Sequence, residues 1–175
     1  MDVVTLDFET FYDAGYTLKT LPTAEYIMTA EFQVIVLSYK INDQPAKWLE
    51  GFSASHELEK IDWANTMLVA HNAMFDGGIL AWRYKIYPAR FFCTMMAARP
   101  IITPFTNSMA LADCAEFLGI GKKGDEVVKA KGKRRADFTK EELAAYGEYC
   151  KNDVELTYKL YKVLTAWYEK NNKDV

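Results

Sequence analysis

The stretch of sequence that decides the fold is residues 3–10, Val-Val-Thr-Leu-Asp-Phe-Glu-Thr. Its β-branched and aromatic residues favour a strand, and its apolar content favours a central place in a sheet. Asp7 and Glu9 are two residues apart, so a strand presents both carboxylates on the same face. Two acids on a buried face are costly unless they are paired or bind a metal ion. An edge strand whose acidic face meets water is the alternative, and the apolar residues around the acids argue against it.

Two other segments place acids where they can meet this strand. Residues 68–76, Leu-Val-Ala-His-Asn-Ala-Met-Phe-Asp, predict a buried strand that leads through a His-Asn pair to Asp76. Tyr149 and Asp153 are four residues apart in a helical pattern, which places them on one helix face. Four converging carboxylates repel one another, so such a cluster requires cations. Oxygen ligands select hard cations, and the chain has only two histidines, so we expect Mg²⁺ or Mn²⁺ rather than zinc.

The pattern along the rest of the chain predicts an α/β sheet covered by helices. We expect strands at 2–8, 25–30, 33–41, 46–50, 66–70 and 91–94, and helices at 57–64, 76–84, 94–98, 108–118 and about 139–170. Thr139 and Glu142 form a capping box at the start of the last helix. A bend is expected within that helix, because one unbroken helix of its length would outgrow the domain.

Length and composition predict a single domain over residues 1–175. The chain is 50% hydrophobic and 26% charged, which is typical of a globular protein with a sizeable core. No apolar run approaches the roughly 18 residues that span a bilayer, and a strand-like run begins at once without a signal peptide. We therefore expect a cytoplasmic protein, in a host cell if it is phage-encoded, with no membrane partner and with reduced cysteines.

A net charge of −3 does not by itself indicate a nucleic-acid-binding protein, but the charge is unevenly distributed. Residues 122–135 carry seven Lys or Arg against two acids, a local surplus of five positive charges. One interpretation is a solvated loop. The other is a phosphate-binding arm that uses Lys131, Lys133, Arg134 and Arg135. Both stay open at this point.

Taken together, the three acidic segments resemble the motifs of the DnaQ-like (DEDD) 3′–5′ exonuclease superfamily, which has a ribonuclease-H-like fold. Residues 7–10 match the first motif, residues 71–76 the second and residues 149–153 the third. Glu148 stands where the histidine subclass has its histidine, so the chain resembles the tyrosine subclass (DEDDy). Residues 17–36 and later segments are similar to the proofreading exonuclease domain of phage family A DNA polymerases, so the resemblance covers nearly the whole chain.

The resemblance implies a mixed β-sheet flanked by α-helices and a site with two divalent cations, Mg²⁺ or Mn²⁺. By that resemblance Asp7 bridges both cations, and Glu9 and Asp153 help to hold the one that activates water. Asp76 holds the second cation. Tyr149 orients the attacking water, because an unperturbed pKa near ~10 makes it a poor general base at neutral pH. The expected products are nucleoside 5′-monophosphates released from a 3′ end.

Five residues are candidates for contact with the nucleic acid: Thr10, Phe11, His71, Asn72 and Phe75. Thr10 and Phe11 follow the first acid pair, where they can meet the terminal sugar and base. Asn72 and Phe75 can meet the next nucleotide by stacking and polar contact. Core packing is the alternative for both phenylalanines and is favoured for Phe75, and a lone histidine such as His71 is more often a satisfied buried residue.

The expected substrate is single-stranded DNA or a frayed 3′ end, with a DNA polymerase or another replication protein as a candidate partner. An exoribonuclease with identical chemistry is an alternative, since the choice rests on the 2′-hydroxyl. A non-catalytic binding module is a further alternative, which the presence of all four acids argues against. No polymerase palm or fingers fit into 175 residues, so either a free-standing exonuclease or an excised domain is expected, and Met1 favours the former.

Overall fold

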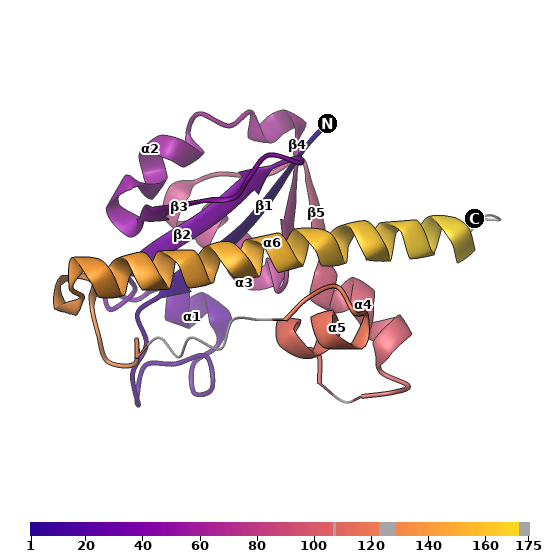
Figure 1. The fold of residues 1–175 in the computed structure, drawn as a ribbon. Coiled ribbons are helices and arrows are strands. Elements are labelled where there is room, and N and C mark those ends of the chain that lie inside the picture. Colours follow the sequence, from indigo (N-terminus) through magenta and orange to yellow (C-terminus); the bar gives the residue numbers. More distant parts are fainter. Residues whose placement is uncertain (107, 123–128, 172–175) are drawn as a thin grey trace.

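The computed structural model describes residues 1–106, 108–122 and 129–171, and a five-stranded sheet lies at its centre (Figure 1). The strands are β1 (Asp2–Thr10), β2 (Val34–Ile41), β3 (Lys47–Glu50), β4 (Thr66–Ala70) and β5 (Arg90–Cys93), in the order β3-β2-β1-β4-β5. Strand β1 pairs antiparallel with β2 and parallel with β4, so the sheet is mixed. The prediction that the first strand is central is confirmed.

Six α-helices surround the sheet in the described part of the chain. They are α1 (Thr23–Met28), α2 (Ala54–Leu58), α3 (Ala73–Ile79), α4 (Thr94–Ile102), α5 (Leu111–Phe117) and α6 (Lys140–Asn171). Short 3₁₀ turns occur at Gly51–Ser53, Trp63–Asn65 and Arg135–Asp137, and a π-helical turn at Leu80–Tyr84 extends α3. Helix α6 crosses the sheet on one face (Figure 1).

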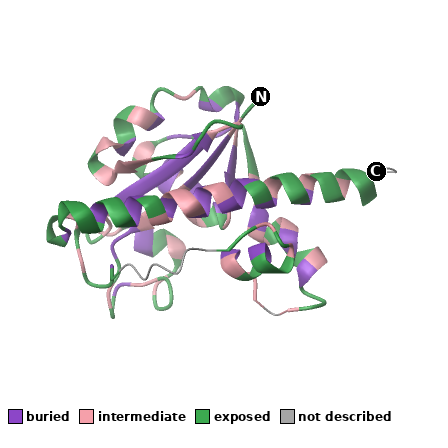
Figure 2. Cartoon of the chain, in the orientation of Figure 1, coloured by how far each residue is buried: buried purple, intermediate pink, exposed green. Residues whose placement is uncertain are grey.

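The two faces of the sheet differ in chemistry because side chains alternate along β1. Asp7 and Glu9 point towards α6, whose Cys150 contacts Asp7. Helix α3 packs on the opposite face, where a Cβ atom on Gly77 would lie 2.8 Å from Phe91 of β5 and 3.8 Å from Leu68 of β4. Buried residues are concentrated on the strands and on the inner side of α6, and others lie on the helices that flank the sheet (Figure 2). The acidic pair therefore lies between the central strand and the longest helix.

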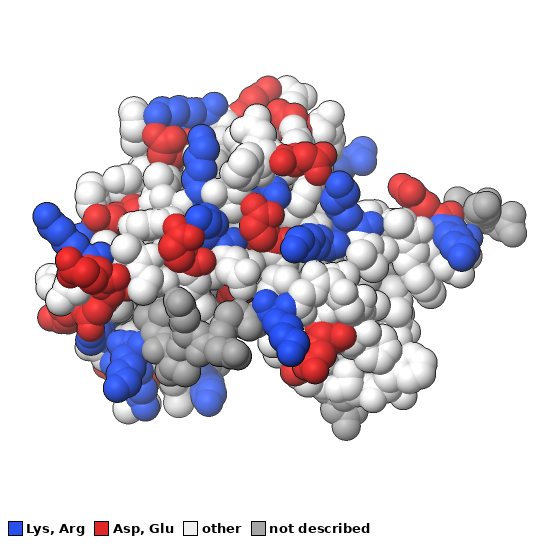
Figure 3. Space-filling model, in the orientation of Figure 1, with Lys and Arg blue, Asp and Glu red and all other residues white. Residues whose placement is uncertain are grey.

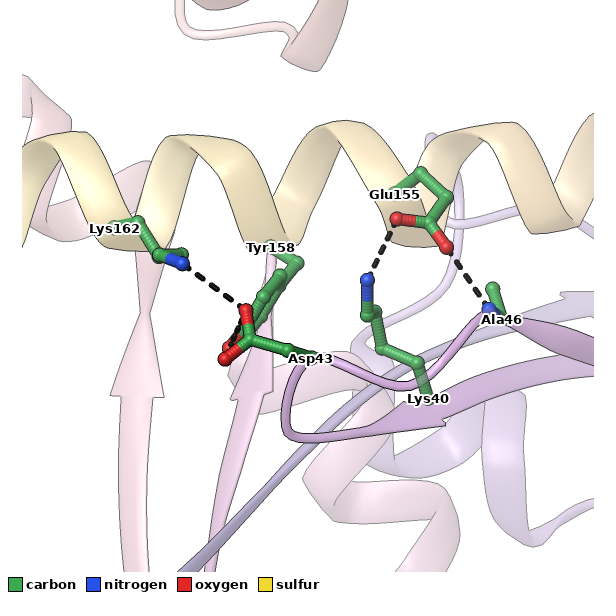
Figure 4. A network of polar contacts seen from close by, with 6 residues as sticks. All are labelled: Lys40, Asp43, Ala46, Glu155, Tyr158 and Lys162. Carbon is green, nitrogen blue, oxygen red and sulfur yellow. Dashed lines mark hydrogen bonds and ion pairs between the residues drawn. The ribbon is translucent and has the colours of Figure 1, made fainter.

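A polar network fixes α6 against the β2–β3 hairpin (Figure 4). Glu155 uses both carboxylate oxygens, one in an ion pair with Lys40 Nζ at 2.7 Å and one as acceptor from the Ala46 N–H at 2.9 Å. The Lys40 side chain is only 6% exposed and that of Glu155 is 34% exposed, so water is excluded mainly from the lysine side of this ion pair. Farther along the helix, Tyr158 donates a hydrogen bond to Asp43 at 3.2 Å. These contacts set the position of α6 along the sheet.

Gly147 lets α6 approach the sheet closely at β3. A Cβ atom at this position would lie 2.1 Å from Cδ2 of Trp48, a distance that no side chain can adopt without a shift. The glycine is thus required by the packing of the helix on Trp48, two residues before Tyr149.

Two predictions about elements in the N-terminal half of the chain were wrong. The expected strand at 25–30 is helix α1, which follows Pro22 at its N-cap and whose Tyr26 and Ile27 are buried in the core. The expected helix at 57–64 is displaced: α2 occupies Ala54–Leu58, and a 3₁₀ turn begins at Trp63.

The last helix is one uninterrupted element of 32 residues, without the expected bend. Its capping box is confirmed, since the Glu142 N–H donates to Thr139 Oγ1 at 3.1 Å and the Thr139 N–H donates to Glu142 at 3.0 Å. The length is accommodated because the C-terminal turns extend beyond the sheet, where they are mostly exposed (Figures 1 and 2). Among the described residues, no helix combines the length and the apolar character that crossing a membrane would require.

Candidate active site

Strand β1 brings Asp7 and Glu9 into contact with α6. The Cys150 thiol lies 3.4 Å from the backbone oxygen of Asp7 and 3.5 Å from Asp7 Oδ2. The Tyr146 hydroxyl donates a hydrogen bond to Glu9 Oε2 at 2.8 Å. One ligand atom each of Asp7, Glu9 and Cys150 lies within 4.8 Å of the others. The two carboxylates are therefore close enough to share a cation.

Asp76 joins the pair from the first turn of α3. It is 3% exposed, and its Oδ1 accepts a hydrogen bond of 3.2 Å from the N–H of Phe8, the residue between Asp7 and Glu9. Burial, and then the negative charge of Asp7, raise the pKa of Asp76 well above its usual value. A carboxylate here is ionised at little cost only when a cation is present. The all-oxygen set of carboxylates, with its mutual repulsion, thus fits hard divalent cations.

Helix α6 contributes Asp153 and Tyr149. Asp153 is 5% exposed, and its negative charge is one of those that act on the Cys150 thiol, together with those of Asp7 and Glu9. Tyr149 is half-buried, with its ring centroid 6.4 Å from that of Tyr146. The structure thus gathers the four predicted acids, which come from three distant segments, at the carboxyl end of β1.

Tyr146 and Cys150 were not among the predicted site residues. They precede Asp153 by seven and three positions, a spacing that places all three on one face of a helix. This spacing was the only sign in the sequence that Tyr146 and Cys150 belong to the site. The spacing alone does not show that this face of the helix meets Glu9. Burial and the nearby Glu9 charge raise the pKa of Tyr146 strongly, so it stays a hydrogen-bond donor.

A pocket of about 180 Å³ opens beside Glu9. Residues that line it include Glu9, Thr10, Tyr12, Leu18, Tyr26 and Phe75. Thr10 Oγ1 lies 2.8 Å from the Tyr26 hydroxyl, which in turn donates to the backbone oxygen of Phe11 at 2.5 Å. Burial raises the pKa of Tyr26 to about 12, so this hydroxyl keeps its proton at neutral pH. The pocket thus combines aromatic walls with an ordered pair of hydroxyls.

His71 and Asn72 lie at the junction of β4 and α3. The His71 ring is half-buried, with Nδ1 3.0 Å from Thr94 Oγ1 and Nε2 2.8 Å from the backbone oxygen of Met109. Asn72 precedes α3, and its backbone oxygen accepts a hydrogen bond from the Phe75 N–H at 2.7 Å. In this arrangement Phe75 lines the pocket, while His71 supports the junction behind it.

The predicted basic stretch reaches the residues that follow β1, although its residues 123–128 lie outside the described part of the chain. Basic side chains gather below the N-terminal end of α6 in the view of Figure 3. The Gly132 N–H donates to the backbone oxygen of Tyr12 at 2.8 Å. The Arg134 guanidinium lies over the ring of Phe11, 4.0 Å from its centroid, and that ring is 6% exposed.

The four candidate basic residues fall into two kinds. Lys133 Nζ forms an ion pair with Glu142 at 2.7 Å, and Arg135 Nε donates to Glu50 at 2.6 Å. Arg134 instead donates to a backbone oxygen of Glu31 at 3.1 Å, and within the described residues neither Arg134 nor Lys131 forms an ion pair shorter than 4.0 Å. Lys133 and Arg135 are thus held in ion pairs, whereas Arg134 and Lys131 have Asp13 only as a more distant acidic neighbour.

Comparison with solved structures finds the same fold in other proteins. Brucella melitensis NrnC matches with a TM-score of 0.68 and 17% identity, covering 98% of this chain and 76% of that one. NrnC bound to pGG matches with a TM-score of 0.64 and 20% identity, covering 97% and 74%. The catalytic core of RRP6 from Trypanosoma brucei matches with a TM-score of 0.66 and 16% identity, covering 97% and 42%. At these identities the likeness shows the fold.

A search of curated proteins found no match. The model of the DNA polymerase A 3′–5′ exonuclease family, by contrast, matches residues 1–168. That range includes all three acidic segments and all five strands. This chain therefore belongs to the 3′–5′ exonuclease family, whose members are metal-dependent nucleases with a ribonuclease-H-like fold.

Proposed function

We propose that the protein removes nucleotides one at a time from the 3′ end of single-stranded DNA and releases nucleoside 5′-monophosphates. The observation that carries this proposal is the convergence of Asp7, Glu9 and Asp76 with Asp153 at the carboxyl end of β1. Membership of a polymerase-related family supports DNA as the substrate and proofreading of polymerase 3′ ends as the context.

The four acids would hold two divalent cations, Mg²⁺ or Mn²⁺. Bound there, such cations supply activation of water and stabilisation of the departing 3′ oxygen. A solved structure of NrnC with bound Mg²⁺ supports this choice of ion. Removal of the cations should leave Asp76 buried beside Asp7 with no compensating positive charge.

Two tyrosines of α6 would position the reacting groups. Tyr149, on the same helix face as Asp153, would orient the attacking water through its hydroxyl. Tyr146 is a positioning residue, because its hydrogen bond of 2.8 Å fixes the rotamer of Glu9. Its raised pKa keeps the proton on the tyrosine, so Glu9 remains the acceptor.

The pocket beside Glu9 would receive the 3′-terminal nucleotide. Phe75, expected from the sequence to meet the next nucleotide, lines this pocket with Glu9 and Thr10 and would stack on the terminal base instead. Such stacking suits every base, which fits an enzyme that degrades any sequence. The proton of Tyr26 is directed to the Phe11 backbone, and the hydroxyls of Thr10 and Tyr26 bond to each other. Thr10 would therefore meet the sugar hydroxyl mainly as an acceptor. Binding of pGG to NrnC supports a nucleic-acid ligand for this fold.

Lys131 and Arg134 would contact phosphates of the strand. Both are close enough to Asp13 to lower its pKa, after the larger effect of the hydrogen bonds that Asp13 accepts from the backbone of Tyr16 and Gly15. Lys133 and Arg135 would instead hold the stretch in place through their ion pairs.

The test is digestion of 5′-labelled single-stranded DNA, duplex DNA and RNA in Mg²⁺, Mn²⁺ or EDTA. We expect a ladder that shortens from the 3′ end, fastest on single-stranded DNA, and no digestion in EDTA. Digestion of RNA alone would replace DNA by RNA as the substrate. Digestion from the 5′ end, or activity unchanged by EDTA, contradicts the proposal.

A further inference from the structure

A second pocket, of about 320 Å³, combines aromatic rings with arginines and shares no lining residue with the pocket beside Glu9. Residues that line it include Phe32, Val34, Phe52, Arg83, Tyr84 and Arg135. Its volume exceeds the approximately 180 Å³ of the pocket beside Glu9. If the pocket beside Glu9 can hold a nucleotide, this larger pocket can hold one too.

The second pocket is a close neighbour of the first. Thr10, which lines the first pocket, pairs across the sheet with Val34, which lines the second. The Tyr26 ring lies between them, with its centroid 6.0 Å from that of Phe75 and 6.0 Å from that of Phe32. The two pockets are thus separated by a single buried aromatic ring.

The exposed groups of this pocket match the chemistry of a nucleotide. Phe52 is 78% exposed, so its ring offers a face for stacking that the protein core does not use. The Arg83 guanidinium lies 4.8 Å from the ring centroid of Phe32 and donates to the backbone oxygen of Thr29, a neutral partner. No ion pair within 4.0 Å neutralises Arg83 among the residues that the structure describes, whereas Arg135 is paired with Glu50.

We propose that this pocket is a second nucleotide site for the substrate strand, in which an upstream base stacks on Phe52 and its phosphate meets Arg83. The inference rests on the proposed nuclease function, because it assigns the pocket to the same strand. A second site makes the affinity for the substrate depend on the length of the oligonucleotide, because a dinucleotide fills only the first pocket and a longer oligonucleotide fills both.

The experiment compares a deoxyribonucleotide dimer with a decamer in wild type, Phe52→Ser and Arg83→Ser. Phe105→Ser and Arg99→Ser serve as matched controls, since both residues are exposed and lie in the α4–α5 part of the chain. For the decamer, Phe52→Ser should raise KM roughly 5-fold to 100-fold, the effect expected for one lost base stack. Arg83→Ser should also lower the salt slope of binding by about 0.7. Dimer kinetics, kcat on the decamer and both controls should stay at wild-type values.

A binding measurement separates this inference from the proposed function. Anisotropy of a labelled, hydrolysis-resistant phosphorothioate decamer is recorded with the same variants. Weaker binding by Phe52→Ser and Arg83→Ser supports the pocket even if wild type hydrolyses nothing, in which case only the proposed function fails. Wild-type hydrolysis with unchanged decamer binding and KM in both variants overturns the pocket and leaves the function intact. If wild type binds no decamer, both proposals fail.

Discussion

Asp7 is the residue on which the proposed site depends most, because it lies beside Glu9, Asp76 and Cys150 at once. Asp7→Ala should lower kcat by at least about 10²–10³ on single-stranded DNA, the effect of removing one preorganised electrostatic group. The apo protein should keep or gain thermal stability, since one charge of a repelling cluster is lost. Asp2→Ala, at the exposed start of the same strand, is the control for activity. Near-normal turnover by Asp7→Ala would refute the role proposed for this acid.

The role proposed for the Tyr149 hydroxyl can be tested with Tyr158, on the same helix, as the control. Tyr149→Phe keeps the ring and should lower kcat about 10²–10⁴-fold with little change in KM. Tyr158→Phe removes a hydroxyl that bonds to Asp43 between β2 and β3, five residues past Asp153 on α6, and should leave kcat unchanged. A raised KM with normal kcat in Tyr149→Phe would show that this residue binds substrate instead.

The basic stretch can be divided by its ion pairs. Replacing Lys131 and Arg134 together by Ser should reduce the salt slope of binding to single-stranded DNA by about 1.4, or roughly 0.7 per phosphate contact. Lys133→Ser should leave the slope unchanged, because that charge is already paired with Glu142. Fluorescence titrations between low and moderate salt measure the slope. Equal slopes in the double variant and the parent would mean that the stretch is only a solvated loop.

Among the elements, α6 depends on close contact with β3 for its position. Gly147→Ala would place a Cβ atom 2.1 Å from Trp48, so the helix must move or the ring must give way. We expect a loss of about 1–3 kcal/mol in the free energy of unfolding, as for other overpacked cores. Activity should fall too, since Tyr149 and Asp153 lie on the same helix.

Denaturant unfolding of the double variant Gly147→Ala/Trp48→Ala provides the control. Removing the indole makes room for the new methyl group, so the two changes should be strongly non-additive. Additive losses would show that the glycine matters for backbone freedom and not for its contact with Trp48.

Features that depend on residues close together in the sequence could be predicted, and features that depend on distant residues could not. The apolar residues around Asp7 and the capping box at Thr139 are local signals, and both led to the correct elements. Tyr26 is the opposite example: a short apolar run at 25–30 fits a strand or a buried helix equally well, and tertiary packing made it helix α1. The hydrogen bond from Tyr146 to Glu9 spans 137 positions, so no local pattern contains it.

At the scale of the whole molecule, the acid cluster should make folding stability depend on pH and on divalent cations together. The folded-state pKa of Asp76 lies well above its unfolded value, chiefly through burial and then through Asp7. The folded protein therefore binds more protons than the unfolded one between those two pKa values, and its stability falls as pH rises through that window. A cation that occupies the cluster removes this penalty by favouring the ionised acids.

The apo protein in EDTA should thus lose melting temperature as pH rises from about 4, near the unfolded pKa of an aspartate, towards neutrality. Mn²⁺ should raise the Tm more at about pH 7 than at about pH 5, because protonated acids bind cations poorly. Asp76→Asn cannot titrate and should flatten the apo profile, whereas Asp62→Asn, exposed before β4, should follow the wild type. Calorimetric melts across this range measure the effect. A cation-induced shift that is the same at both pH values, with an apo profile unaffected by Asp76→Asn, would mean that Asp76 does not couple metal binding to folding.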